Sequence, residues 1–241
     1  MKMYTAISLT AVLILCATIA DIRTNRMISK QDRKHAVICG SIIILCTVCE
    51  WCGQKIDGVA AIRLLHMCVR LIELCMASVI GVAVAFSYGM PSAENLLLYY
   101  VPRRVCISIL RLRKDGNFLI DAGGFYHRGT VFEITVIVFL ASLSYGIVCM
   151  IKAGIRYQAK FNGVLVLTLL LLVVGTGSLF ITGHPRANYL SIALANMLFY
   201  IEFYRMTLQI DGVTELLNRR CYETALMDVK PGQCHSSDRF Q

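Results

Sequence analysis

Apolar residues along this chain are grouped in long blocks that short polar or charged segments separate. About 20 apolar residues in a row form a helix that crosses a bilayer, and helices are the default there because hydrocarbon offers backbone groups no outside partner. Seven such blocks occur: Met3–Ala20, Ala36–Cys52, Leu71–Tyr88, Asn95–Leu112, Phe132–Ile151, Gly163–Thr182 and Ala187–Tyr204. The pattern predicts an all-α fold, a polytopic transmembrane helical bundle of six to seven helices.

Two of the blocks leave the helix count open. The fourth carries Pro102, Arg103 and Arg104 inside it, and an arginine near the centre of a spanning helix costs about 2.5–3.5 kcal/mol. The first block starts at the N-terminus, where a signal peptide is the alternative, but no small-x-small cleavage site precedes a polar mature start. We therefore expect the first block to be retained as a helix.

Composition and charge support a membrane location. The chain is 57% hydrophobic and 16% charged, whereas a soluble domain is about 45–50% apolar and about 25% charged. The net charge of +9 comes from lysines and arginines between the blocks, as expected of cytoplasmic loops in membrane proteins rather than of a nucleic-acid-binding surface. The lipid bilayer is thus the expected partner, with no nucleic acid.

The same charges predict an orientation. Basic residues are concentrated in the segment Asp21–His35 and again after the fifth block, at Lys152, Arg156 and Lys160. Both segments are expected to be cytoplasmic. With seven crossings the protein is a multi-pass cell-membrane protein whose N-terminus lies outside and whose C-terminus is cytoplasmic.

The cysteines are predicted to face the membrane or to pack, rather than to carry chemistry. Most of the 11 cysteines lie inside apolar blocks, where a free thiol behaves as a small hydrophobic group. Cys46, Cys49 and Cys52 share one face of a helix, but no fourth ligand is evident nearby. We therefore predict no metal site.

The segment Asp211–Leu226 follows the last apolar block and has helical composition. Asp211 and Thr214 are good capping residues, and an amphipathic pattern starts at Glu215. These features predict a short C-terminal cytoplasmic helix. The segment also resembles the opening of a GGDEF domain, the diguanylate cyclase module, with matches at Asp211, Thr214, Leu216, Asn218, Arg219, Arg220, Tyr222 and Leu226.

This resemblance divides the chain into a transmembrane sensor region, 1–204, and a signalling helix with the truncated start of a GGDEF domain, 205–241. Val213 and Glu215 depart from the family pattern, and Glu215 replaces the glycine at the helix start. The resemblance implies that Asn218 corresponds to the asparagine that contacts guanine. It also implies cyclic di-GMP signalling, in which two GTP are cyclised with the help of Mg²⁺.

The chain as given contains no Gly-Gly-(Asp/Glu)-Glu-Phe turn and no metal-binding carboxylates after Leu226. We therefore predict no catalytic residues and no cofactor for this chain, although Mg²⁺ and GTP are expected for a complete family member. The expected product is catalytically incomplete, either a truncated cyclase or a sensor half. Whether the protein is an enzyme stays open at this point.

The membrane half resembles the multi-helix sensor region found on GGDEF-domain proteins. The residues that carry this resemblance are Asp57-Gly58, followed by Arg63 and Leu64, and the loop from Ile120 to Gly129. Asp121, Tyr126, His127 and Arg128 form a candidate sensing loop for an unknown extracytoplasmic ligand or for pH, since histidine titrates near neutrality. The alternative is an ordinary solvated loop with a turn at Gly123-Gly124.

Arg63, His66, Arg70 and Glu73 follow helical spacing, and Arg70 and Glu73 are placed to pair near the membrane edge. Local neutralisation of charge is the simplest reason for such a pair.

Two further functions stay open. One is a non-enzymatic membrane module that tunes a partner cyclase, with a second copy of the chain as a candidate partner. The other is a degenerate type IV prepilin peptidase, because the segment from Asp21 to Ile28 resembles the first aspartate motif of those enzymes. The second aspartate of those enzymes would correspond to Asn95 in the segment Ser92–Asn95. An asparagine cannot serve as a general base.

Overall fold

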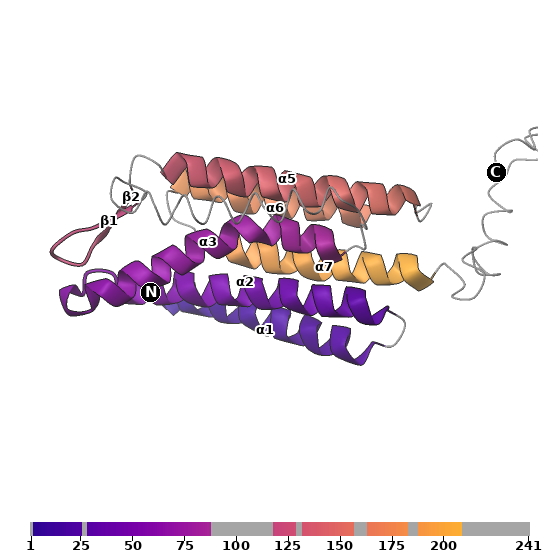
Figure 1. Cartoon of the computed structure of the whole chain (residues 1–241), viewed down its shortest axis with the longest axis horizontal. Helices are drawn as coiled ribbons and strands as arrows, with labels where there is room; N and C mark the ends of the chain where they lie inside the picture. Colours follow the sequence, from indigo (N-terminus) through magenta and orange to yellow (C-terminus); the bar gives the residue numbers. More distant parts are fainter. Residues whose placement is uncertain are drawn as a thin grey trace, which may run out of the picture.

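The computed structural model describes residues 2–25, 28–87, 118–128, 132–156, 163–182 and 188–208. These residues are mostly helical. The helices run side by side along the long axis of the molecule (Figure 1). They are α1 (Lys2–Thr24), α2 (Lys30–Ile56), α3 (Arg63–Ser87), α5 (Phe132–Arg156), α6 (Gly163–Thr182) and α7 (Asn188–Leu208), with a 3-10 turn η1 at Ala60–Ile62 before α3.

The described helices coincide with every predicted block except the fourth, Asn95–Leu112, which lies outside the described residues. Several predicted boundaries were wrong: α3 begins at Arg63, eight residues before its apolar block, α5 continues to Arg156, and the basic segment Asp21–His35 is largely helical. The hydroxyl of Ser29 accepts a hydrogen bond from the backbone N–H of Asp32 at 3.1 Å. This N-cap lets α2 begin at Lys30, six residues before the apolar block.

Three of the described helical stretches are long and apolar enough to cross a membrane: Met3–Thr24, Lys30–Ile56 and Ala60–Gly81. The helices α5 and α6 contain shorter apolar stretches, Val136–Cys149 and Val166–Gly175. A membrane protein fits this pattern. The number of spanning helices and their orientation stay predictions.

The helices form three layers, with α5 and α6 on one side, α3 and α7 between, and α1 and α2 on the other side (Figure 1). The core lies where α1, α2, α3 and α7 meet. Its buried side chains include Leu15, Ile43, Cys46, Ile80, Ala193 and Phe199. Among the cysteines of the apolar blocks, Cys39, Cys46, Cys75 and Cys149 are buried free thiols that pack as predicted, whereas Cys16 and Cys68 are exposed.

Small residues allow two close helix contacts. A Cβ atom at Gly81 would overlap the backbone carbonyl of Ser142, so glycine lets α3 and α5 touch backbone to backbone. A Cβ at Gly175 would likewise overlap the side chain of Ser191, which brings α6 against α7. Close approach at small residues is a common way for membrane helices to associate.

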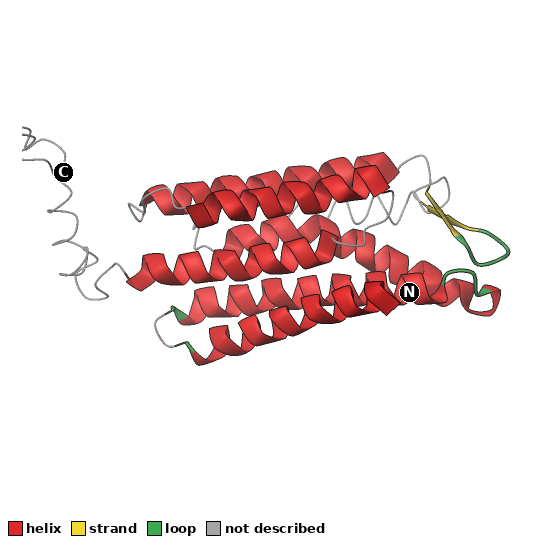
Figure 2. Ribbon diagram, turned by 180° about the vertical axis from the view of Figure 1, so that it is seen from behind, coloured by secondary structure: helices red, strands yellow, loops and turns green. Residues whose placement is uncertain are grey.

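A two-stranded antiparallel hairpin corrects the all-α prediction. Its strands are β1 (Phe118–Ile120) and β2 (Tyr126–Arg128), with Leu119 opposite His127. The hairpin lies at the end of the bundle where α2 turns into α3 (Figure 2). Strands of three residues are too short for their alternation to stand out in a sequence. The predicted turn at Gly123-Gly124 is confirmed, and Gly124 has a φ of +86°.

Candidate functional site

The hairpin is fastened to the corner between α2 and α3. The backbone N–H of Gly58 donates to the carbonyl of Gly124 at 3.2 Å, and the N–H of Tyr126 donates to the Asp57 carboxylate at 2.9 Å. These residues come from the two segments, Asp57-Gly58 and Ile120–Gly129, on which the resemblance of the membrane half depends. The structure brings the two segments into direct contact.

Two glycines with positive φ make this docking fit. Gly58 has a φ of +83°, and its missing Cβ would lie 2.9 Å from the Phe125 ring. The missing Cβ of Gly124 would lie 2.7 Å from the backbone carbonyl carbon of Val59. Positive φ favours glycine at both positions. At Gly124 the close approach of backbone atoms is a second reason for glycine, whereas at Gly58 a side chain would also displace the exposed Phe125 ring.

The candidate sensing residues divide between the two faces of the hairpin. Asp121 accepts a hydrogen bond from the N–H of Phe125 at 2.9 Å and lies 3.2 Å from the His127 ring nitrogen Nε2, and both side chains are exposed. The bond from the Phe125 N–H, together with the His127 contact, holds the pKa of the Asp121 carboxyl below its usual range. Arg128 is placed as a residue of β2, opposite Phe118.

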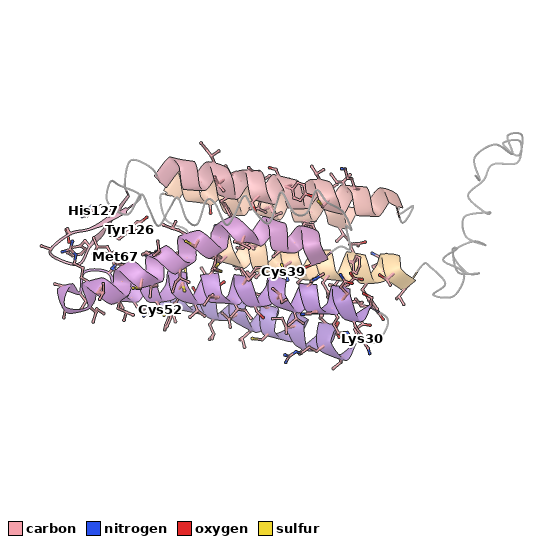
Figure 3. The ribbon with its side chains drawn as sticks, viewed as in Figure 1. Lys30, Cys39, Cys52, Met67, Tyr126 and His127 are labelled. Carbon is pink, nitrogen blue, oxygen red and sulfur yellow. The ribbon has the colours of Figure 1, made fainter. Side chains whose placement is uncertain are left out.

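Tyr126 turns toward the bundle and covers a buried charge. The guanidinium carbon of Arg70 lies 4.9 Å from the centroid of the Tyr126 ring, a cation–π geometry. The ring of His66 lies beside them, with its centroid 6.5 Å from that of Tyr126. Figure 3 shows Tyr126 and His127 at this end and Lys30 at the other.

His66 joins the hairpin to Arg70. Its Nδ1 atom lies 3.3 Å from the carbonyl oxygen of Gly124, and Arg70 Nε donates to its Nε2 at 3.4 Å. Both contacts fit the neutral imidazole that carries its proton on Nδ1, because Nε2 must accept while Nδ1 donates.

The polar contacts then continue to α7. Nη1 of Arg70 donates to Oε2 of Glu73 at 2.8 Å, which confirms the predicted pair. The hydroxyl of Tyr189 on α7 donates to the other Glu73 oxygen at 3.3 Å. All three side chains are buried. We call His66, Arg70, Glu73, Tyr126 and Tyr189 the outer cluster.

Three residues were not predicted from the sequence: Tyr189, which belongs to the outer cluster, and Gly53 and Glu50, which lie beside it. Gly53 makes room for the guanidinium, since a Cβ there would lie 2.7 Å from Arg70 Cζ. Glu50 is only 2% exposed and accepts a hydrogen bond from Gln54 at 3.2 Å. Glu50 had a detectable signal, because a carboxylate inside an apolar block marks a functional position in membrane proteins. Tyr189 had none, because its partner is 116 residues away.

At the opposite end of the bundle, α1 and α7 are joined through Asp21. The Tyr200 hydroxyl donates to the Asp21 carboxylate at 2.6 Å and accepts a hydrogen bond from the Asn25 amide at 3.1 Å. Asp21 is the residue to which the peptidase alternative assigns catalysis. The segment Ser92–Asn95, which that alternative needs for its second carboxylate, lies outside the described residues.

The GGDEF-like motif residues also lie outside the described residues: Asp211, Thr214, Leu216, Asn218, Arg219 and Arg220. Within the part of the chain that is described, no group of three or more His, Cys, Asp or Glu side chains is arranged to hold a metal ion. Cys46 and Cys49 are buried and Cys52 is half-buried on the same helix.

No protein-family profile, curated protein sequence or solved structure matches this chain. The fold and the outer cluster therefore define the class by themselves: a protein whose described residues are mostly helical, include three helices long and apolar enough to span a membrane, and dock a hairpin on a buried polar cluster.

Proposed function

We propose that this chain is the membrane sensor portion of a GGDEF-family, cyclic di-GMP signalling protein. The observation that carries the proposal is the hydrogen bond from Tyr189 on α7 to Glu73 on α3. Through it, the helix that precedes the GGDEF-like motif touches the same polar cluster on which the hairpin is docked. A change at the hairpin thereby alters the position of α7.

The direction of α7 supports this role. The helix begins at Asn188, beside the buried cluster, and ends at Leu208, three residues before Asp211, where the motif starts. The signal runs along the segment Leu190–Ile210, which passes it from the bundle to the effector domain. A rigid helix is a direct way to carry a displacement across a bilayer.

The charge distribution supports the orientation. The α1–α2 turn, with exposed Arg23, Lys30 and Lys34, lies at the end where α7 finishes, away from the hairpin (Figures 1 and 3). Lysines and arginines near helix ends favour the cytoplasmic side. In this orientation the hairpin and the start of α1 are outside the cell, and the end of α7 is inside.

The hairpin is the part of the site that an extracytoplasmic ligand reaches. Asp121, Phe125 and His127 are exposed, whereas Tyr126 contacts the buried guanidinium. The exposed residues of the hairpin are therefore separated from the buried Arg70 guanidinium by a single residue, Tyr126. GTP and Mg²⁺ belong to the effector domain, whether that domain is in the same chain or in a partner cyclase.

The test is a fusion of residues 1–210 to an intact diguanylate cyclase domain, with cyclic di-GMP production measured in membranes. Tyr189→Phe removes one hydroxyl and its bond to Glu73. Interhelical hydrogen bonds in membranes contribute about 0.6–1.7 kcal/mol, so the output should change roughly 3- to 20-fold. Tyr204→Phe, on the same helix, is the matched control and should leave the output within about twofold.

Expression and thermal unfolding in detergent verify that both fusions fold. An unchanged output for a folded Tyr189→Phe protein would contradict the proposal.

A further inference from the structure

Three polar residues of α7 lie on one face of the helix. Tyr189 and Asn196 are two turns apart, and Tyr200 is one turn further on. Each contacts a different helix: Tyr189 bonds Glu73 on α3, the Cys39 thiol on α2 donates to Asn196 at 3.6 Å, and Tyr200 bonds Asp21 on α1. One face of α7 is thus joined to the bundle at three levels.

The contact at Tyr200 is the shortest of the three. Its hydroxyl lies 2.6 Å from Asp21 Oδ2, which is the range of a hydroxyl bond to an ionised carboxylate. The Asn25 amide donates to the same hydroxyl at 3.1 Å. Asp21 is exposed, so water can solvate its carboxylate whenever the bond opens.

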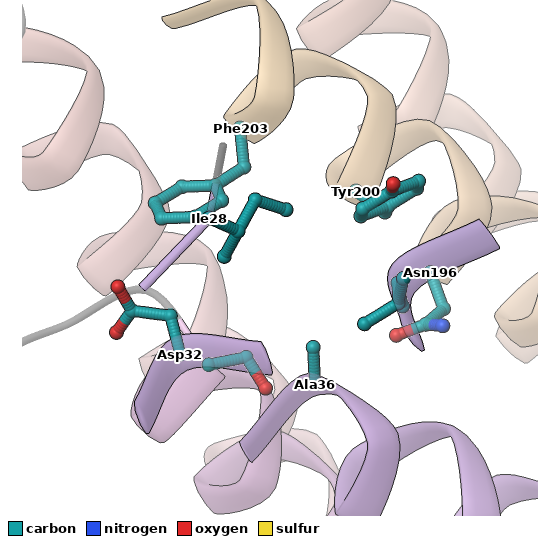
Figure 4. Close-up of a pocket in the computed structure, with 8 residues that line it drawn as sticks. Ile28, Asp32, Ala36, Asn196, Tyr200 and Phe203 are labelled. Carbon is teal, nitrogen blue, oxygen red and sulfur yellow. The ribbon is translucent and has the colours of Figure 1, made fainter. Parts of the chain in front are cut away.

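A small hollow lies directly beside this contact. It is lined by apolar and polar side chains, namely Ile22, Ile28, Asp32, Ala36, Ser87, Asn196, Tyr200 and Phe203. Figure 4 shows Tyr200 and Phe203 from α7 on one side of it and Asp32 and Ala36 from α2 on the other. Protein interiors have few such gaps. Here the gap is about the size of a single water molecule.

We propose that Asp21, Asn25 and Tyr200 form a latch that holds the cytoplasmic end of α7 in one position. The inference rests on the proposed function, because it names how the output of α7 is regulated. In the latched state the Tyr200 hydroxyl bonds Asp21 and Asn25. In the released state the hydroxyl bonds water and the exposed carboxylate is solvated. A change at the hairpin is transmitted along α7 when the latch opens.

The latch predicts a specific result for double variants. If opening the latch is the step that follows the loss of the Tyr189–Glu73 bond, a protein whose latch is already open has nothing left to transmit. Tyr200→Phe breaks the latch by removing its hydroxyl, and Asp21→Asn weakens it by replacing the charged acceptor with a neutral amide oxygen. The effect of Tyr189→Phe should therefore disappear in the Tyr200→Phe background and shrink in the Asp21→Asn background, a non-additivity that separate sites do not show.

The experiment uses the same 1–210 fusion and measures cyclic di-GMP for Tyr200→Phe, Asp21→Asn, Tyr189→Phe and the double variant Tyr189→Phe with Tyr200→Phe. We expect Tyr200→Phe and Asp21→Asn to change the output several-fold in the same direction, and the double variant to match Tyr200→Phe within about twofold. Tyr204→Phe is the control for loss of a hydroxyl elsewhere on α7. Thermal unfolding verifies that every variant folds.

The outcomes separate the two proposals. If Tyr189→Phe changes the output and folded Tyr200→Phe does not, the latch is overturned and the sensor function stands. If Tyr200→Phe and Asp21→Asn change the output and Tyr189→Phe does not, the latch stands and the route from the hairpin is overturned. If none of the three changes it, both proposals fall. Multiplying effects in the double variant would also overturn the latch.

Discussion

The guanidinium of Arg70 on α3 lies 4.9 Å from the centroid of the Tyr126 ring on the hairpin. Nη1 of the same guanidinium donates a hydrogen bond to Glu73 Oε2 at 2.8 Å. One side chain therefore contacts both the hairpin that we propose to be extracytoplasmic and the carboxylate that reaches α7. A planar cation is well suited to this position, because its face stacks on an aromatic ring while its edge donates hydrogen bonds.

Arg70→Lys tests whether the planar group matters or only the charge. Lysine keeps the positive charge but lacks the planar guanidinium, which donates several hydrogen bonds and stacks on the ring. We therefore expect a loss of about 1–2 kcal/mol in the free energy of unfolding. Amide exchange should also become faster at Tyr126, whose N–H donates to the Asp57 carboxylate. Hydrogen exchange in detergent micelles, read by mass spectrometry, measures both effects. Equal protection in the two proteins would mean that charge alone holds the hairpin.

Gly53→Ala should disturb the outer cluster although none of the members of the cluster is substituted. The new Cβ would lie 2.7 Å from Cζ of Arg70, and the guanidinium cannot move without weakening its bond to Glu73. Overpacking of this kind costs about 1–3 kcal/mol. The midpoint of thermal unfolding in detergent is the measurement.

The matched control is Gly177→Ala on α6, where a Cβ meets nothing within 4 Å. Alanine is also the better helix former of the two residues, so this control should be neutral or stabilising. A similar loss at both positions would show that the clash with Arg70 is unimportant.

Gly124→Ala should undock the hairpin from the α2–α3 corner. The position combines a φ of +86° with a Cβ site 2.7 Å from the Val59 carbonyl carbon, and a left-handed conformation alone costs roughly 1–2 kcal/mol for alanine. The amide of Gly58, which donates to Gly124, should lose its protection from exchange. Gly123→Ala is the neighbouring control, because its Cβ meets only side-chain atoms, the nearest at 3.2 Å. Undiminished protection at Gly58 in Gly124→Ala would refute this account.

The hairpin tip should loosen in acid. Bonds from the Phe125 N–H and from His127 hold the pKa of Asp121 below its usual value of 3.8. A group whose pKa is lowered by folding contributes stability that is complete above its unfolded pKa and is lost as the pH falls through the folded one. We therefore expect the Phe125 amide resonance to be constant down to about pH 4 and to shift toward a free amide below it. Asp121→Asn should abolish this transition, and a transition that persists would assign it to another group.

The apolar blocks predicted most of the bundle, because each helix buries or exposes its own continuous run of residues. They could not predict the hairpin, whose strands are three residues each and whose position depends on Gly58 meeting Gly124. The Arg70–Glu73 pair was predictable because both residues lie on one helix. Tyr189 and Gly53 were not, since each matters only through a residue on another helix.

The candidate sensing loop was predicted from residue types, and the structure divides it into an exposed pair, Asp121 with His127, and an inward-facing Tyr126. Nothing in the sequence distinguishes the two roles, because neighbours in a strand alternate between faces only once the register is known. The same holds for Asp21. From the sequence alone, Asp21 is a polar residue at the end of the first apolar block, and only the fold shows that Tyr200 contacts it.

Gly175 keeps α6 in contact with Ser191 on α7. A shift of α7 must therefore carry α6 with it or break that contact. The exposed apolar residues of α6 are Val166, Leu167, Leu170, Val173 and Val174, and in a bilayer they would face the lipid tails. Moving them changes how much apolar surface matches the hydrocarbon thickness, at a cost of fractions of a kcal/mol per Å. If α7 moves within a bilayer as we propose, the thickness of the surrounding membrane enters the energy of its displacement, and the same stimulus would give different outputs in thin and thick bilayers.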